Sequence, residues 1–236
     1  MGNLLIIGAG GHGKVVADIA RDSGRWEEIA FLDDNYPDSI ILGLWKVRGK
    51  TEESKRFLKQ FPEALVAIGA NAVRLATIRR LTAEGFQVPT LIHPDASVSR
   101  LSVIGAGSVI CAQSAIKIDT TIGMGAIINA GATIAHDCTL ADGVHISPGG
   151  RISGDVQIGE CTWLGSGAII KEQVTIGHHV IIGAGSVVIR DVPDGVKVVG
   201  IPGRIIPQTS PNPPTSAPDL TIEIGRACNT TALVTQ

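Results

Sequence analysis

Residues 104–134, IGAGSVICAQSAIKIDTTIGMGAIINAGATI, carry an aliphatic side chain at every sixth position. Four residues after each aliphatic of this register, as far as Ser186, no side chain is larger than valine. An amphipathic helix or an ordinary sandwich would lose the register within about two or three repeats, whereas a parallel β-helix keeps it. The seventeen aliphatics of the unbroken register are Ile92, Val98, Ile104, Ile110, Ile116, Ile122, Ile128, Ile134, Leu140, Ile146, Ile152, Ile158, Leu164, Ile170, Ile176, Ile182 and Val188.

The spacing also predicts how this all-β part of the chain is built. Each hexapeptide is expected to form one flat side, so that three sides close a coil of about 18 residues. The aliphatic side chain points inward and stacks on its counterpart in the next coil, roughly 4.8 Å along the axis. The small residue lies near the corner, where a bulky side chain would not fit. Past Val188 the repeat stops, and residues 196–206 are expected to form a closing strand and turn.

The residues before the repeat follow a different pattern, in which short apolar runs alternate with helical spacing. A helix is expected after Gly13, a second from Thr51 with its hydroxyl as a cap, and a third from Asn71. The side chain of Asn71 is expected to cap the third helix, and Gly85 to end it. This alternation predicts an α/β domain with a parallel sheet covered by helices. The three apolar runs predict buried strands at residues 3–8, 29–32 and 64–69.

The composition limits the class of protein. Lysine and arginine number 20 against 22 aspartates and glutamates, which gives a net charge of −2. This balance provides no electrostatic reason to expect nucleic acid or an anionic membrane as partner. The 3% of aromatic residues and the 29 glycines favour a core of stacked small and branched side chains. No apolar run of ~18 residues predicts a membrane span, and no basic leader with a cleavage site follows Met1.

The cysteines and the C-terminal residues limit the class of protein further. The four cysteines form no CxxC pair and no disulfide-like framework, so a cytoplasmic protein with reduced thiols is the simplest interpretation. Residues 207–218 contain five prolines and no packable pattern, so residues 207–236 are expected to form a flexible tail. No metal site is expected either, because His178 and His179 lack further ligands around them.

A glycine-rich turn follows the first strand and opens the first helix. Gly8, Gly10 and Gly13 stand at the spacing of the dinucleotide fingerprint, and Asp33 lies twenty residues after Gly13. In that motif the helix N-terminus receives a phosphate. Full NAD binding usually needs two βαβαβ halves, and only one fits before the β-helix. A P-loop is excluded because Val15 stands where a Mg²⁺-binding Ser or Thr is required. A tight strand–helix turn without a ligand is the alternative.

Four features occur together in this chain: the turn GAGGHG at residues 8–13, Asp33-Asp34, Ile92-His93-Pro94, and His136-Asp137 within the hexapeptides. In this combination the chain resembles bacterial sugar acetyltransferases that join a small Rossmann-like domain to a left-handed β-helix. The sialic acid O-acetyltransferases and the N-acetyltransferase of the bacillosamine pathway belong to this group, and a GDP-perosamine N-acetyltransferase is similar. The resemblance covers roughly residues 3–206. It implies a Rossmann-like domain over residues 1–90, a β-helix acetyltransferase domain over residues 91–206, left-handed coiling and a homotrimer.

The resemblance implies that the small domain binds a nucleotide-linked amino sugar. Asp33 and Asp34 are then expected near the base or ribose, and Asn129 is expected to hydrogen-bond the acceptor sugar. Arg74, after the third strand, either lines the same crevice or is a solvated helix residue. The other residues expected to contact the nucleotide sugar are Gly8, Gly10, Gly11, His12 (near the diphosphate or sugar), Gly13 and Gly69.

The dipeptide His136-Asp137 is the candidate for catalysis. Acetyl transfer from a thioester to an amine needs a base, and histidine suits this because its ordinary pKa lies near neutrality. By the resemblance His136 is the base and Asp137 orients it, although several relatives carry a longer Glu there. Side chains of neighbouring strand residues point to opposite faces, so the two can meet only at a corner. The alternative is an ordinary polar corner of the β-helix.

The resemblance also implies where acetyl-CoA binds. His145 lies nine residues beyond His136, half a coil away, so the two occupy different sides of the prism. If both serve one active site, that site is shared between neighbouring subunits. His145 is expected to contact acetyl-CoA, where a donor stabilises the developing oxyanion; a surface histidine is the alternative. The small residues expected to line the cofactor groove are Gly154, Ser166, Gly183 and Ala184.

The sequence therefore predicts a cytoplasmic enzyme that transfers acetyl from acetyl-CoA, without a metal, to the amino group of a nucleotide-linked sugar for surface glycans. O-acetylation of a sugar such as sialic acid is the first alternative. A non-catalytic trimeric β-helix that serves as a binding or scaffold protein is an alternative of another class. Stabilisation by both acetyl-CoA and a nucleotide sugar would favour the enzyme, because ligands that bind the folded state raise its stability.

Overall fold

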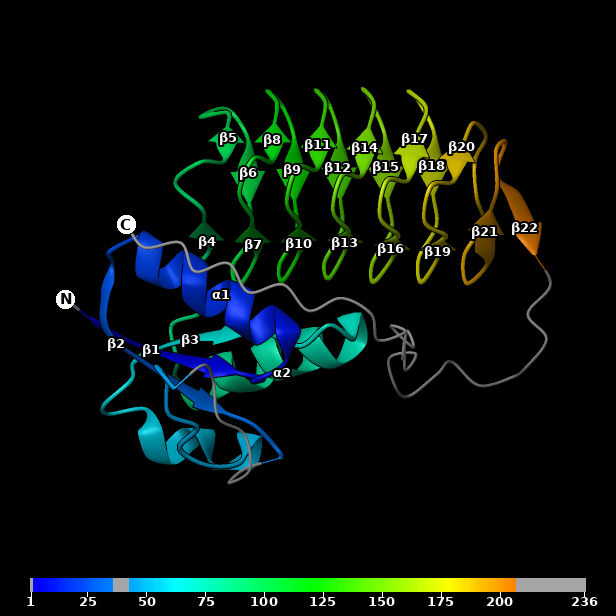
Figure 1. Ribbon diagram of the computed structural model, residues 1–236. Coiled ribbons are helices and arrows are strands. Elements are labelled where there is room, and N and C mark those ends of the chain that lie inside the picture. Colours follow the sequence, from blue (N-terminus) through cyan, green and yellow to red (C-terminus); the bar gives the residue numbers. More distant parts are fainter. Residues whose placement is uncertain (1, 36–42, 207–236) are drawn as a thin grey trace, which may run out of the picture.

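The computed structural model describes residues 2–35 and 43–206. A small α/β domain lies beside a long parallel β-helix, next to the half where the β-helix begins (Figure 1). The flexible tail expected over residues 207–236, together with Cys228, lies outside the described residues. None of the helices in the described parts of the chain is long and apolar enough to cross a membrane.

The small domain is a three-stranded parallel sheet in the order β2-β1-β3, as the alternation of apolar runs predicts. Successive side chains of the central strand point to opposite faces. Leu4 and Ile6 belong to one buried cluster with residues of α1, whereas Leu5 and Ile7 belong to another with residues of α2. Its elements are β1 (Gly2–Ile7), α1 (Gly11–Asp22), β2 (Trp26–Leu32), the 3-10 helix η1 (Thr51–Phe57), β3 (Glu63–Val66) and α2 (Asn71–Glu84).

Two predicted helix caps are wrong, and one helix end is confirmed. The hydroxyl of Thr51 donates to Asp34 Oδ1 at 2.7 Å instead of capping the helix, which is a short 3-10 helix. Asn71 is the first residue of α2, and its amide group donates to the carbonyl of Cys161 in the β-helix. Both side chains serve tertiary contacts, which outweigh the local capping preference. Gly85 ends α2 in the left-handed conformation, with φ of 101°.

Residues from Leu91 onward form a parallel β-helix with three flat faces. The eight-stranded face contains β4 (Leu91–Ile92), β7 (Val109–Ile110), β10 (Ile127–Ile128), β13 (His145–Ile146), β16 (Trp163–Leu164), β19 (Ile181–Ile182), β21 (Lys197–Val199) and the antiparallel β22 (Arg204–Ile206). The six-stranded face contains β5 (Ser97–Val98), β8 (Ala115–Ile116), β11 (Thr133–Ile134), β14 (Arg151–Ile152), β17 (Ile169–Ile170) and β20 (Val187–Val188). The five-stranded face contains β6 (Val103–Ile104), β9 (Thr121–Ile122), β12 (Thr139–Leu140), β15 (Gln157–Ile158) and β18 (Thr175–Ile176).

The repeated aliphatics form the core of the prism, as the sequence predicts. Ile128 pairs with Ile146, one coil later, and the same pairing recurs on each face. From Ile110 to Val188 every aliphatic of the register is buried. Ile92 is the exception to the predicted inward stack: it is 39% exposed, because no coil precedes it to cover the open end of the prism.

From Gly107 to Gly185, each corner of the β-helix contains one residue in the left-handed conformation, three positions after the inward aliphatic. Glycine fills half of these positions, and Asp137 is among the others, with φ of 60°. We give names to three sets of corner residues. The domain-facing corner, which lies against the small domain, comprises residues 123–126, 141–144 and 159–162. The histidine corner comprises residues 135–138 and 153–156, and the third corner residues 129–132, 147–150, 165–168 and 183–186.

The small domain covers the beginning of the eight-stranded face. Three outward side chains of that face, Leu91, Val109 and Ile127, are each only 1% exposed. Helix α2 runs along the domain-facing corner at close range, since a Cβ added to Gly143 would lie 2.8 Å from Leu75 Cδ1. The outward residues that follow on this face, beginning with His145, stand at the edge of the small domain.

Candidate active site

The pair His136–Asp137 lies in the histidine corner, where β11 turns into β12. The left-handed backbone of Asp137 lets its side chain meet the preceding imidazole, so that Nδ1 of His136 lies 2.5 Å from Oδ2 of Asp137. The two side chains are 63% and 52% exposed. The predicted meeting of the pair at a corner is therefore what the structure has. A carboxylate that accepts from Nδ1–H leaves the lone pair on Nε2 for a substrate.

Gly154 stands one coil above His136, at the equivalent position of the histidine corner. A Cβ at this glycine would lie 2.7 Å from Cε1 and 2.9 Å from Nε2 of the imidazole. These distances are shorter than any ordinary contact, so a side chain here would displace the ring. Gly154 therefore allows the imidazole to lie across the next coil with its Nε2 edge unobstructed.

A second histidine cluster lies at the junction of the two domains. His12, from the start of α1, and His145, from β13, are half-buried, and the Nε2 atom of each is buried without a hydrogen-bond partner. Burial, with the nearby charge of Arg74, lowers the pKa of His12 to about 4. Burial, Arg74 and then His12 lower the pKa of His145 to about 3. Both rings are therefore neutral at physiological pH, which leaves each with one donor and one acceptor nitrogen.

An aromatic residue from the next coil stacks on His145. Trp163, one coil later on the eight-stranded face, stacks on His145 with a centroid distance of 5.9 Å and an interplanar angle of 16°. Its indole Nε1–H donates to Ser147 Oγ at 2.8 Å, which fixes the ring, yet the side chain remains 41% exposed. An exposed indole that packing and a hydrogen bond hold in place is a surface for a ligand with an apolar face.

The glycines of the GAGGHG turn fall into two groups. A Cβ at Gly8 would lie 2.9 Å from Ala67 O, and one at Gly13 only 2.2 Å from Gly8 O, so packing explains both glycines. At Gly10 and Gly11 a Cβ would meet nothing within 4 Å, and neither backbone is left-handed. These two glycines leave the N-terminus of α1 uncovered, where the first amides of a helix can bind a phosphate.

The remaining small-domain residues that are predicted to contact the nucleotide sugar lie around this turn. Asp33 Oδ2 accepts from Ala9 N at 2.7 Å, so this carboxylate holds the glycine turn in place. Asp34 is exposed and bonded to Thr51. Gly69 is exposed, and its carbonyl accepts from Arg74. The structure thus brings the predicted small-domain residues to the same end of the parallel sheet, where its strands terminate.

The predicted cofactor residues do not come together within one chain. Gly154 lies beside His136 in the histidine corner, whereas Ser166, Gly183 and Ala184 lie in the third corner. His145 lies on the eight-stranded face, between the domain-facing corner and the third corner. Asn129 also lies in the third corner, where its Oδ1 accepts from Ala130 N at 2.8 Å. Within one chain, the predicted site residues therefore lie on different sides of the prism.

The sequence did not single out Trp163 and Ser147, and it left the place of Arg74 open. Arg74 is 1% exposed, which rules out the solvated helix residue. Its position in α2 carries no signal of burial, because the partners belong to turns 51 and 69 residues later in the chain. Trp163 could have been found, since it occupies the outward position of its hexapeptide one coil after His145.

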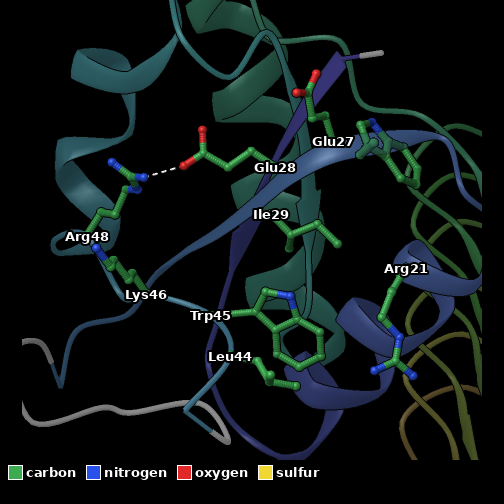
Figure 2. Close-up of a pocket in the computed structure, with 9 residues that line it drawn as sticks. Arg21, Glu27, Glu28, Ile29, Leu44, Trp45, Lys46 and Arg48 are labelled. Carbon is green, nitrogen blue, oxygen red and sulfur yellow. Dashed lines mark hydrogen bonds and ion pairs between the residues drawn. The ribbon is translucent and has the colours of Figure 1, made fainter.

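An open hollow of about 390 Å³ lies away from these residues, at the edge strand β2. In Figure 2, Trp45 and Leu44 line one part of this hollow, and the ion pair between Arg48 and Glu28 lines another. None of the predicted site residues lines it. Over the residues that the structure describes, no three His, Cys, Asp or Glu side chains are grouped to hold a metal ion.

Comparison with known proteins gives two family matches. The PglD N-terminal domain matches residues 3–81, and the bacterial transferase hexapeptide (six repeats) matches residues 155–190. UDP-N-acetylbacillosamine N-acetyltransferase from Bacillus subtilis (strain 168) is 39% identical over 114 residues, which are 48% of this chain and 52% of that protein. The match thus spans about half the length of this curated relative.

Two solved structures match along most of the chain. The acetyltransferase domain of PglB from Neisseria gonorrhoeae FA1090, in complex with acetyl coenzyme A, is 43% identical, with a TM-score of 0.82 over 86% of this chain and 98% of that one. A mutant of GDP-perosamine N-acetyl transferase from Caulobacter crescentus, in complex with CoA and GDP-perosamine, is 38% identical, with a TM-score of 0.83 over 88% of this chain and 98% of that one. With the α/β domain, the β-helix and both family matches in agreement, the chain belongs to the PglD-like family of hexapeptide-repeat acetyltransferases.

Proposed function

We propose that this protein transfers the acetyl group of acetyl-CoA to the amino group of a nucleotide-linked amino sugar. The observation that carries the proposal is the exposed His136 imidazole, with Asp137 on Nδ1 and Nε2 unobstructed above Gly154. The names of the relatives support the substrates, because they describe N-acetyltransferases of sugars linked to UDP or GDP and complexes with acetyl coenzyme A.

The chemistry follows from the geometry of the pair. The neutral amine attacks the thioester carbonyl, which forms the new C–N bond and places negative charge on the carbonyl oxygen. His136 Nε2 takes the amine proton, and Asp137 stabilises the resulting imidazolium. Collapse of the tetrahedral intermediate breaks the C–S bond, and the proton passes to the departing thiolate of CoA. A base in this position contributes ~10²–10⁴-fold to the rate.

We further propose that the active site forms between copies of the chain in a homotrimer. His136 and Gly154 face one side of the prism, whereas His145, Ser166, Gly183 and Ala184 belong to another face and corner. A threefold packing of parallel prisms brings the histidine corner of one copy against the eight-stranded face of the next. The nucleotide would bind at the N-terminus of α1, with the sugar directed toward His145 and the partner subunit's base.

The product of this reaction, an acetamido sugar on a nucleotide, is a building block for surface glycans, and a cytoplasmic location fits it. The three described cysteines, Cys111, Cys138 and Cys161, are free, which is consistent with a reducing compartment.

Release of CoA should be measured with a panel of UDP- and GDP-linked amino sugars and with free sialic acid as an O-acceptor. Turnover of a nucleotide-linked amino sugar is expected. Turnover of sialic acid alone would establish the O-acetyltransferase instead. If no acceptor is turned over and acetyl-CoA does not raise the melting temperature, the chain is a binding or scaffold protein and the proposal is wrong.

Sharing of the site between subunits has its own test. Subunits of inactive His136→Ala and His145→Ala variants should be exchanged and the activity of the mixture measured. If each site takes one histidine from each of two neighbours, about a quarter of the sites in random trimers regain both. A mixture as inactive as its components would show that one chain supplies both histidines.

A further inference from the structure

Arg74 is a buried cation without an anionic partner. All five of its N–H groups donate to neutral oxygens at 2.7–3.2 Å, and no ion pair of Arg74 occurs among the described residues. Burial lowers its pKa to about 10, so it keeps its charge at physiological pH. The neighbouring Leu75 and Ile78 already seal this interface with apolar contacts. The need for an apolar interface between the domains therefore does not account for a guanidinium at this position, because burying a charge is unfavourable in itself.

The oxygens that Arg74 binds belong to both domains. Ile68, Gly69 and Asn71 lie in the small domain, whereas Gly125 and Gly143 lie in the domain-facing corner of the β-helix. The two corner carbonyls occupy the same position in successive coils.

The next carbonyl of that series, one coil further, is also taken up by the small domain. It belongs to Cys161 and accepts from Asn71 Nδ2 at 2.9 Å, while Asn71 Oδ1 accepts from Arg74. The two side chains therefore bind the equivalent carbonyl of three consecutive coils. This arrangement fixes the small domain along the β-helix axis as well as against its surface.

Burial is the larger cause of the lowered pKa values of His12 and His145, and the charge of Arg74 lowers both further. His12 belongs to the small domain and His145 to the β-helix, and each presents a buried Nε2 without a partner. The two unpartnered nitrogens thus lie on the two domains that Arg74 joins. A cation at this place favours the neutral form of both rings.

We propose that Arg74 is a positioning residue that, together with Asn71, fixes the small domain in register with three coils of the β-helix and so sets where His12 and His145 stand relative to each other. It touches neither ligand and acts through the two histidines. That His12 and His145 bind ligands rests on the proposed function. The register of the two domains and the effect of the Arg74 charge on the histidines rest on this chain alone.

Two variants of Arg74 separate its geometry from its charge. Arg74→Lys keeps the positive charge but offers only three hydrogen-bond donors to the five acceptors. Arg74→Met removes both the charge and the donors. Arg79→Ala is the matched control, since Arg79 stands on the same helix, is exposed and approaches Asp142 and Glu160 only at 3.8 Å. The kcat/KM for the nucleotide sugar should fall about tenfold in the Lys variant and about 100-fold in the Met variant. The control should stay within about twofold of the wild type.

A second readout does not depend on activity. NMR titration of labelled histidines in the ligand-free protein should show the pKa values of His12 and His145 raised by about half a unit or more in Arg74→Met. They should stay close to the wild-type values in Arg74→Lys and Arg79→Ala. Unchanged histidine titration in Arg74→Met would overturn the charge effect, and unchanged kcat/KM in both variants would overturn the positioning.

Loss of folding has to be distinguished from loss of positioning. Circular dichroism should show both variants folded; unfolding of both under conditions where Arg79→Ala stays folded would make Arg74 a structural residue only and overturn the proposal. If the wild type acetylates no nucleotide sugar, the proposed function fails, while the titration still decides the charge effect.

Discussion

Two histidines nine residues apart in this chain occupy opposite environments. His136 stands at an exposed corner with a carboxylate on Nδ1. His145 stands at the domain junction, where burial and Arg74 lower its pKa to about 3. At the first histidine the carboxylate accepts from Nδ1–H and leaves Nε2 for a substrate, whereas burial opposes protonation of the second. One histidine is therefore suited to take up a proton and the other to remain neutral and form hydrogen bonds.

This difference shows that the corner and the face of a β-helix offer different chemistry to the same side chain. At a corner, the left-handed residue directs a neighbouring carboxylate toward the imidazole. On a face, the outward side chain lies among its neighbours of the next coils, here Trp163, and at the edge of the small domain that covers the beginning of the face. The following four predictions test this contrast.

Removal of the exposed histidine should have the largest effect. His136→Ala is expected to lower kcat by ~10²–10⁴-fold, because no other base replaces its Nε2. The melting temperature and the oligomeric state, from a thermal scan and sedimentation, should not change, since the side chain is exposed. A variant with substantial residual turnover would remove His136 as the base.

A side chain at Gly154 should displace the same ring without removing it. In Gly154→Ala the new Cβ would overlap the imidazole, and a displaced catalytic group can lower kcat by about 100-fold. Stability should change by less than about 1 kcal/mol, because this glycine is not left-handed. Steady-state kinetics and chemical denaturation measure the two effects. Activity equal to the wild type would show that the ring position does not matter.

The carboxylate of the pair should have a smaller effect. Asp137→Asn keeps the size of the side chain but no longer stabilises the imidazolium, so kcat is expected to fall by about 10- to 100-fold. Measurement of kcat against pH would show the change in the base directly. An Asp137→Asn enzyme with the wild-type pH profile would assign Asp137 to the backbone turn alone.

The buried histidines should appear in the pH dependence of stability. The folded pKa values of about 4 for His12 and about 3 for His145 lie below the unfolded value of 6.5. Between these values the unfolded chain binds more protons than the folded one, so stability is present above pH 6.5 and is lost as the pH falls. The loss is up to about 1.4 kcal/mol per pH unit for each histidine.

Urea denaturation at pH 7 and pH 5 would measure this loss. A variant with both His12→Asn and His145→Asn should lose clearly less stability than the wild type between the two pH values. Equal losses in the two proteins would mean that both histidines are already protonated, or solvated, in the folded state.

The hexapeptide register was enough to predict the β-helix and its inward stack, because these features depend on local repeats. The pairing of His136 with Asp137 was implied by the family resemblance, on the condition that a corner lies between them, and the structure has that corner. The register was insufficient at the open end, where Ile92 has no preceding coil to cover it. The burial of Arg74 and the tertiary bonds of Thr51 and Asn71 could not be predicted, since their partners become neighbours only when the chain has folded. The stacking of Trp163 on His145 lies between these cases: the period places them together, but nothing local indicates that the indole stays exposed there.

The carbonyl series at Gly125, Gly143 and Cys161 has a consequence for how the two domains find each other. A repeating structure offers the same acceptors at every coil, so the docking site of Asn71 and Arg74 is degenerate along the axis. The chain resolves this ambiguity with a short tether, from Gln87, which bridges to Glu63, to β4 at Leu91. A shift of the small domain by one coil would stretch this tether by roughly 4.8 Å. The short segment from Gln87 to Leu91 thus limits which coils the small domain can reach, and the contacts of Asn71 and Arg74 then fix the domain there.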